Sequence, residues 1–148
     1  MSDLTAENVR VMLSRVGLSQ SEVARVVGAQ ERTVRRWMAG DPGPDGDAFL
    51  PSPQHWLRLF NLCKAQDRAA DQAMRLIYRL RNLAEETGER LDPVTVRLAR
   101  DDADARRAGM PFLSAHIAVV RRIVERCEAE RIPYDVLAML PPPPPRRA

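Results

Sequence analysis

The sequence predicts a mainly α-helical protein made of two small units. Hydrophobic residues recur at spacings of three and four over most of the chain, which is the period of a helix with one buried face. Glycines follow several of these stretches, where a left-handed residue ends a helix at little cost. The composition of 45% hydrophobic and 29% charged residues is typical of a folded domain. We expect a helical bundle first and a helix-strand-helix unit after it.

The first two helices are predicted from an apolar stripe and a capping pattern. Residues 5–16 place apolar side chains at intervals of three and four, and Gly17 then ends the helix. Ser19 and Glu22 have the spacing of a capping box, which begins a second helix that ends at Gly28. The apolar stripe of the first helix consists of Val9, Met12, Leu13 and Val16.

A third helix is predicted to begin at Ala29 or Gln30 and to end at Gly40. Residues 41–53 are rich in Pro and Gly, so we expect a loop there, with Phe49 placed against the core. The apolar positions of the third helix are Val34, Trp37 and Met38.

A fourth helix is predicted to start at Ser52 and Pro53, which are residue types favoured at the N-cap and the first helical position. Over residues 67–86, apolar side chains form a narrow seam at spacings of three and four. This seam either continues the fourth helix or follows a break at residues 65–67. Gly88 ends it in both cases.

A short strand is predicted over residues 93–99, where Val94, Val96 and Leu98 alternate with polar side chains. A single strand needs a partner, because an open edge is a liability. The sequence offers no clear second strand. We therefore expect this strand to pair with the same strand of a second copy of the chain.

The remaining segments complete the second unit. A short acidic helix is expected to reach residue 107. Residues 114–131 predict a longer helix whose inward side chains are Ile117, Val120, Ile123, Val124 and Cys127. The proline run near the end predicts polyproline II or disorder. The chain therefore divides into a first unit at 1–66, a C-terminal dimerisation region at 67–138 and a proline-rich tail at 139–148.

Several functional classes are not expected from this sequence. No apolar run reaches the roughly 18 residues of a membrane span, and the N-terminus lacks signal-peptide features, so a cytoplasmic protein without a membrane partner is expected. Cys63 and Cys127 have no metal-ligand spacing and are interpreted as small buried residues. No catalytic, metal-binding or cofactor-binding pattern is evident, so an enzyme is not expected.

Residues 18–40 have the features of a helix-turn-helix, in which a positioning helix is followed by a helix that enters the major groove of DNA. Ala24 is small enough for the two helices to cross closely, Gly28 allows the turn, and Val34 fixes the inward face. The segment resembles the Xre/Cro family of phage-repressor-like domains. The matching residues are Leu18, Ser19, Gln20, Ala24, Gly28, Thr33, Val34, Trp37 and Gly40.

Positive charge is concentrated in the same segment. The net charge of +3 does not indicate nucleic-acid binding by itself, and a pI of 9.4 is only compatible with it. Residues 20–37, however, hold four arginines and two glutamates. Such charges also occur on ordinary solvent-exposed helices. Here they occur in the same segment as the turn glycine and the capping box, and this combination favours a DNA-reading helix.

The resemblance implies that four residues read base edges. Arg32 and Arg36 match base-facing positions, where arginine bonds the O6 and N7 atoms of guanine. Gln30 and Glu31 match such positions too, and their side chains suit adenine and cytosine.

Three further residues are implied as backbone contacts. Gln20 stands at the positive start of the second helix and matches a phosphate-binding position, and Arg35 is also expected at a phosphate. Thr33 either binds phosphate or makes a local backbone hydrogen bond.

The expected function is that of a sequence-specific transcriptional regulator, a homodimeric repressor of its own or a neighbouring operon. A dimer would read an inverted repeat in double-stranded DNA, with half-sites roughly 34 Å or one turn apart. The order of elements is also similar to regulators of mobile elements, including those that repress anti-CRISPR operons. The alternative is an antitoxin or adaptor whose C-terminal half binds a partner protein.

Overall fold

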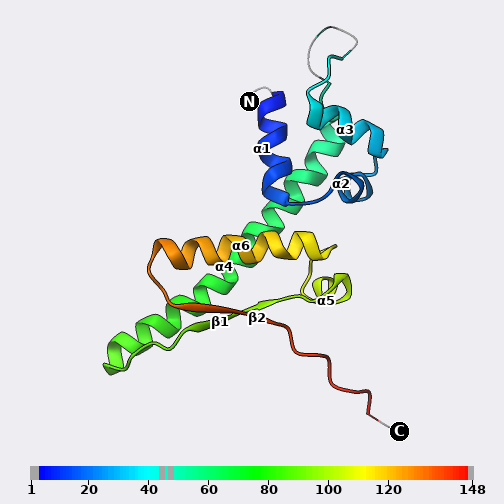
Figure 1. The fold of residues 1–148 in the computed structure, drawn as a ribbon. Helices are drawn as coiled ribbons and strands as arrows, with labels where there is room; N and C mark the ends of the chain where they lie inside the picture. The colour runs from blue at the N-terminus through cyan, green and yellow to red at the C-terminus, as the bar shows by residue number, and fades with distance from the viewer. Residues whose placement is uncertain (1–3, 44–45, 47–48, 147–148) are drawn as a thin grey trace.

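A computed structural model describes residues 4–43, 46 and 49–146, and this part of the chain is mainly helical with one small sheet (Figure 1). The prediction of a mainly α-helical protein is therefore confirmed. The elements in chain order are α1 (Ala6–Val16), α2 (Gln20–Val27), α3 (Glu31–Ala39), α4 (Pro53–Thr87), β1 (Val94–Leu98), α5 (Asp102–Arg107), α6 (Leu113–Ala129) and β2 (Tyr134–Ala138).

The first three helices begin and end where the local sequence predicts. The Ser19 hydroxyl accepts from the Glu22 amide at 3.2 Å, and the Glu22 carboxylate accepts from the Ser19 amide at 2.9 Å, which completes the capping box. Gly17 and Gly28 end α1 and α2 in the left-handed conformation. The core between these helices and α4 contains Val9, Val16, Val23, Val27, Val34, Trp37 and Leu59, each at most 1% exposed.

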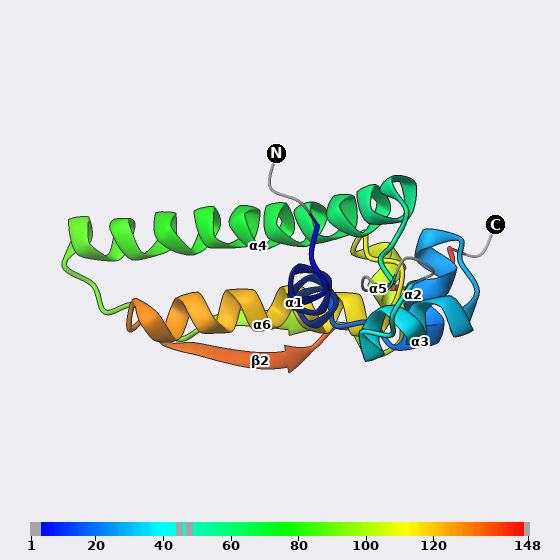
Figure 2. The ribbon, with the colours of Figure 1, turned by 90° about the horizontal axis from the view of Figure 1, so that it is seen from above.

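Helix α4 is one continuous helix of 35 residues that runs along the length of the molecule (Figure 2). The Ser52 hydroxyl accepts from the His55 amide at 3.2 Å, and Gly88 ends the helix with a φ of 70°. Of the two alternatives for residues 67–86, continuation of the fourth helix is therefore correct. The expected unit boundary after residue 66 falls inside α4, which contributes to both halves of the structure.

Helix α6 crosses α4 (Figure 1), and Gln66 of α4 bonds both α1 and α6. Its fully buried side chain donates to the carbonyl of Val16 at the end of α1, at 3.0 Å, and to that of Ala115 in α6, at 3.2 Å. Arg122 of α6 donates to the Gln66 amide oxygen and to Asp67. This polar cluster fixes the first three helices relative to α6.

The predicted strand has its partner within the chain. β1 pairs in parallel with β2, in a register from Val94 opposite Tyr134 to Leu98 opposite Ala138. The expectation that the sequence offers no second strand is therefore wrong, and with it the reason for pairing this strand with a second copy. The connection between the strands holds α5 and α6, and such a crossover is what parallel strands require.

Helix α6 buries most of the face that the sequence predicts, with one exception. Ile117 was predicted to face inward, but its side chain is 39% exposed. The buried stripe follows His116, Val120, Ile123 and Cys127, of which the last three were predicted, and Ile117 lies beside this stripe. Cys63 and Cys127 are both buried free thiols, as predicted.

Candidate nucleic-acid interface

Helices α2 and α3 are joined by a tight turn at residues 28–30. The amides of Gly28 and Ala29 both bond the carbonyl of Ala24, at 2.9 and 3.0 Å, which closes the end of α2. Gln30 is the N-cap residue of α3, so of the two predicted starts the later one is correct. A φ of 76° at Gly28 favours glycine at this turn.

Arg58 of α4 holds this turn against the rest of the protein. Its guanidinium donates to the carbonyl of Val27 at 2.6 Å, where α2 ends. A β-carbon at Gly28 would lie 2.6 Å from the same guanidinium, so a larger residue would displace Arg58 as well as strain the backbone. The sequence reading missed Arg58, because no local pattern shows that a side chain in α4 reaches back to the end of α2.

The outward face of α3 is basic. Val34 and Trp37 face the core, and the helical period therefore directs Arg32 and Arg35 to solvent. Glu31 precedes them in the first turn, where a carboxylate is stabilised by the helix dipole. The structure thus brings Gln30, Glu31, Arg32 and Arg35 together as exposed side chains.

Arg36 differs from the other arginines of α3. It is half-buried, and its guanidinium lies 4.0 Å from the centre of the Phe49 ring. The Phe49 amide bonds the Asp41 carbonyl at 2.7 Å, which anchors the end of the loop beside α3. Phe49 packs against the core as predicted, but its contact with Arg36 was not anticipated. A guanidinium stacked in this way is less free to turn than those of Arg32 and Arg35.

The start of α2 is partly occupied by the C-terminal unit. Gln20 is half-buried in the first turn, and the Glu22 carboxylate accepts from the Ser114 hydroxyl of α6 at 2.8 Å. One turn further on, Arg25 lies 5.1 Å from the centre of the Phe112 ring. Residues 112–114 therefore support α2 from the side, a contact that joins segments far apart in the sequence. Thr33 is half-buried on α3.

Other site types find little support in the described residues. Asp101 caps α5 by accepting from the Asp104 amide at 2.8 Å, and the buried carboxylate of Asp104 bonds Arg100 and Arg107. Across residues 4–43, 46 and 49–146, no three His, Cys, Asp or Glu side chains are grouped as metal ligands. In the same residues, no helix combines the length and hydrophobicity of a membrane-crossing segment. No protein-family model matches this chain, and a search of curated proteins gives no match.

Proposed function

We propose that α2 and α3 form a helix-turn-helix of the Xre/Cro type, and that the protein is a sequence-specific DNA-binding regulator. The observation that carries this proposal is the orientation of α3. Its inner face is fixed by Val34 and Trp37, while Arg32 and Arg35 project from the opposite face into solvent. A short, rigid, basic helix with one free face suits the major groove.

The arrangement supports a division of roles among the exposed residues. Arg32 lies at the centre of the outward face of α3 and is the proposed reader of guanine, with Gln30 and Glu31 beside it at the start of the helix. Arg35 lies to one side and would contact a phosphate. Gln20 and Thr33 would bind phosphates at the groove edge, and Arg36 would reach DNA from its position on Phe49.

Occupation of a promoter by such a protein would exclude RNA polymerase, so we propose a homodimeric repressor of its own or a neighbouring operon. The operator would be an inverted repeat, because a two-fold dimer presents two identical helices. One helix reads only a few base pairs, and the second half-site adds both affinity and specificity.

Selection of bound fragments from random duplex DNA, followed by binding assays on the enriched site, tests this function. Arg32→Ala is expected to weaken operator binding by about 1–3 kcal/mol and to relax the base preference at one position. Arg35→Ala is expected to lower the salt slope by about one unit with little change in preference.

Arg68→Ala is the matched control, because Arg68 is an exposed arginine of α4 and its loss changes the net charge equally. It is expected to leave operator binding near the wild-type value. Failure to enrich any sequence, or equal binding by all three variants, would contradict the proposal.

A further inference from the structure

Helix α4 carries a second apolar stripe that its own chain leaves open. Leu76, Leu80 and Leu83 are 59%, 44% and 57% exposed. The buried residues of the same stretch, Met74 and Ile77, lie on the adjacent face and contact the core. The open stripe consists of Leu76, Leu80 and Leu83, at intervals of four and three, the spacing of a coiled-coil seam. Ala69 and Ala73 continue this spacing but are partly buried against the core.

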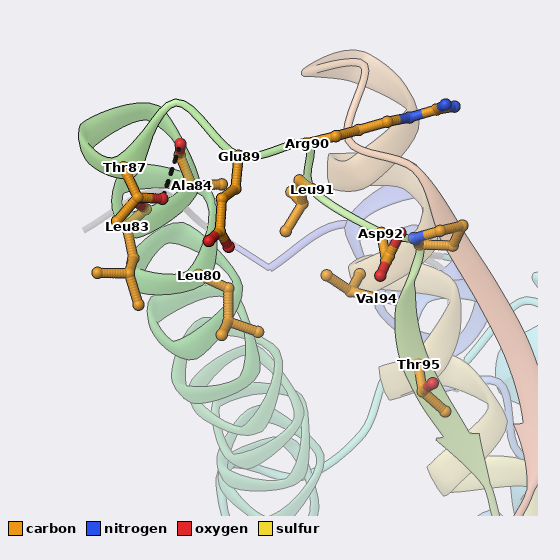
Figure 3. A pocket seen from close by; sticks show the side chains of 11 residues that line it. Leu80, Leu83, Ala84, Thr87, Glu89, Arg90, Leu91, Asp92, Val94 and Thr95 are labelled. Carbon is orange, nitrogen blue, oxygen red and sulfur yellow. Dashed lines mark hydrogen bonds between the residues drawn. The ribbon is translucent and has the colours of Figure 1, made fainter.

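The end of this stripe forms one wall of an open groove of about 470 Å³ (Figure 3). Leu80, Leu83 and Thr87 line it from α4, and residues 89–95 line it from the other side. Leu91 and Val94 lie between the helix and β1, so the floor of the groove is apolar (Figure 3). Apolar surface of this kind, bordered by charged side chains, is typical of an interaction site.

We propose that a second copy of the chain occupies this groove, with the two α4 helices antiparallel about a two-fold axis. The inference rests on the homodimer of the proposed function and assigns its interface. The seam from Ala69 to Leu83 extends about 21 Å along the helix at 1.5 Å per residue, and its exposed part from Leu76 to Leu83 about 10 Å. A single short helix pair buries little surface compared with the roughly 800 Å² that each partner of a stable interface buries. Residues 89–95 add to the area of the contact beyond the helix pair.

The charges beside the stripe select a second copy and an antiparallel register. Arg79 and Glu86 are exposed, lie seven residues apart and border the same open side of the stripe. When Leu80 packs against the partner's Leu83, Arg79 comes opposite the partner's Glu86, and the two-fold axis repeats this pair. A parallel pair would instead place identical charges at the same level. The surface is therefore complementary to itself, as an isologous interface requires.

Sedimentation equilibrium on the full chain, without DNA, tests this interface. The wild type is expected to be a dimer. Leu80→Glu is expected to weaken the dimer by at least about a hundredfold, because it places two carboxylates in an apolar contact. Leu57→Glu is the matched control, because Leu57 is 56% exposed on α4 but lies outside the stripe. This control is expected to remain dimeric, and a far-UV circular dichroism spectrum checks that both variants are folded.

A charge exchange tests the register independently of Leu80. Arg79→Glu and Glu86→Arg are each expected to weaken the dimer by about tenfold, because each loses two opposite-charge pairs and gains repulsion. The double variant restores the pairs with reversed sign and is expected to recover most of the affinity. Additive losses in the double variant would overturn the antiparallel register.

The same variants separate failure of the interface from failure of DNA binding. A wild type that stays monomeric, or a folded Leu80→Glu variant that stays dimeric, would overturn the interface. Either result leaves contacts of Arg32 with a half-site measurable. If Leu80→Glu is monomeric, it is expected to bind a single half-site with the affinity of the wild type. It is expected to lose the higher affinity that the wild-type dimer has for the inverted repeat. If Leu80→Glu dissociates the dimer but neither the wild type nor the variant binds DNA, the proposed interface stands and the proposed regulatory function is rejected.

Discussion

The two halves of α4 lie in different surroundings. The N-terminal half is packed by α1 and α2, and its apolar side chain Leu59 is fully buried. It also exposes Leu57 and Phe60, which are neighbours on one side of the helix, and the Lys64 ammonium lies 5.3 Å from the centre of the Phe60 ring. The C-terminal half is covered by α6 on one side and leaves a row of leucines open on another. The apolar face of the N-terminal half is covered within the chain, whereas the C-terminal half leaves apolar side chains exposed, as one side of an interface would.

The largest expected difference between the halves concerns leucine truncation. Leu59→Ala is expected to lower the free energy of unfolding by about 2–5 kcal/mol, because a buried leucine leaves a cavity. Leu83→Ala is expected to change the stability of the monomer by less than about 0.5 kcal/mol, because the side chain is already in solvent. Urea unfolding at a protein concentration below the dimer dissociation constant measures both. Equal losses would contradict the contrast between the halves.

A smaller effect is expected where the two halves meet. Gln66→Leu is expected to cost about 1–3 kcal/mol, because it removes the donors to the carbonyls of Val16 and Ala115. Gln72→Leu makes the same chemical change at an exposed position of α4 and is expected to be nearly neutral. Equal urea midpoints for the two variants would show that the Gln66 cluster does not stabilise the junction.

The smallest expected effect is a pH dependence at Cys127. Burial raises the pKa of this thiol, and its neighbour Arg126 contacts Tyr78 in the C-terminal half of α4. Because the folded pKa lies above the unfolded value of about 8.5, the stability is complete below that pH and is lost as the pH rises through the folded pKa. Cys127→Ala is expected to flatten the decline of unfolding free energy above about pH 8.5, which urea unfolding at a series of pH values measures. Parallel profiles for wild type and Cys127→Ala would contradict this assignment.

The first four helices could be predicted because their signals are local. The capping pair Ser19 and Glu22, and the glycines at 17, 28 and 40, act within one turn of the chain. The inward residues Val34 and Trp37 then fix the direction of the arginines on α3. The proposed DNA-reading face was therefore largely accessible from the sequence.

Contacts between segments far apart in the sequence could not be predicted in this way. Alternation over residues 94–98 predicts a strand but says nothing about its partner. Residues 134–138 follow a proline and include the charged Asp135, so they do not stand out as a strand. Parallel pairing also needs a long crossover, so turn signals do not reveal it. The positions of Arg36 on Phe49 and of Arg58 at the end of α2 depend on tertiary packing in the same way.

The length of α4 sets how far apart two bound DNA half-sites would lie. In the proposed register, the two-fold axis passes level with residues 81 and 82, and the core that α1 and α2 form with α4 includes Leu59. At 1.5 Å per residue, this distance is roughly 34 Å on each side of the axis. The two Leu59 residues would then lie about 68 Å apart along the helix axes, a spacing nearer to two turns of B-DNA than to the single turn expected from the sequence. The length of α4 would thus determine the spacing of the half-sites, and a dimer could not bind both half-sites of an operator in which they lie one turn apart.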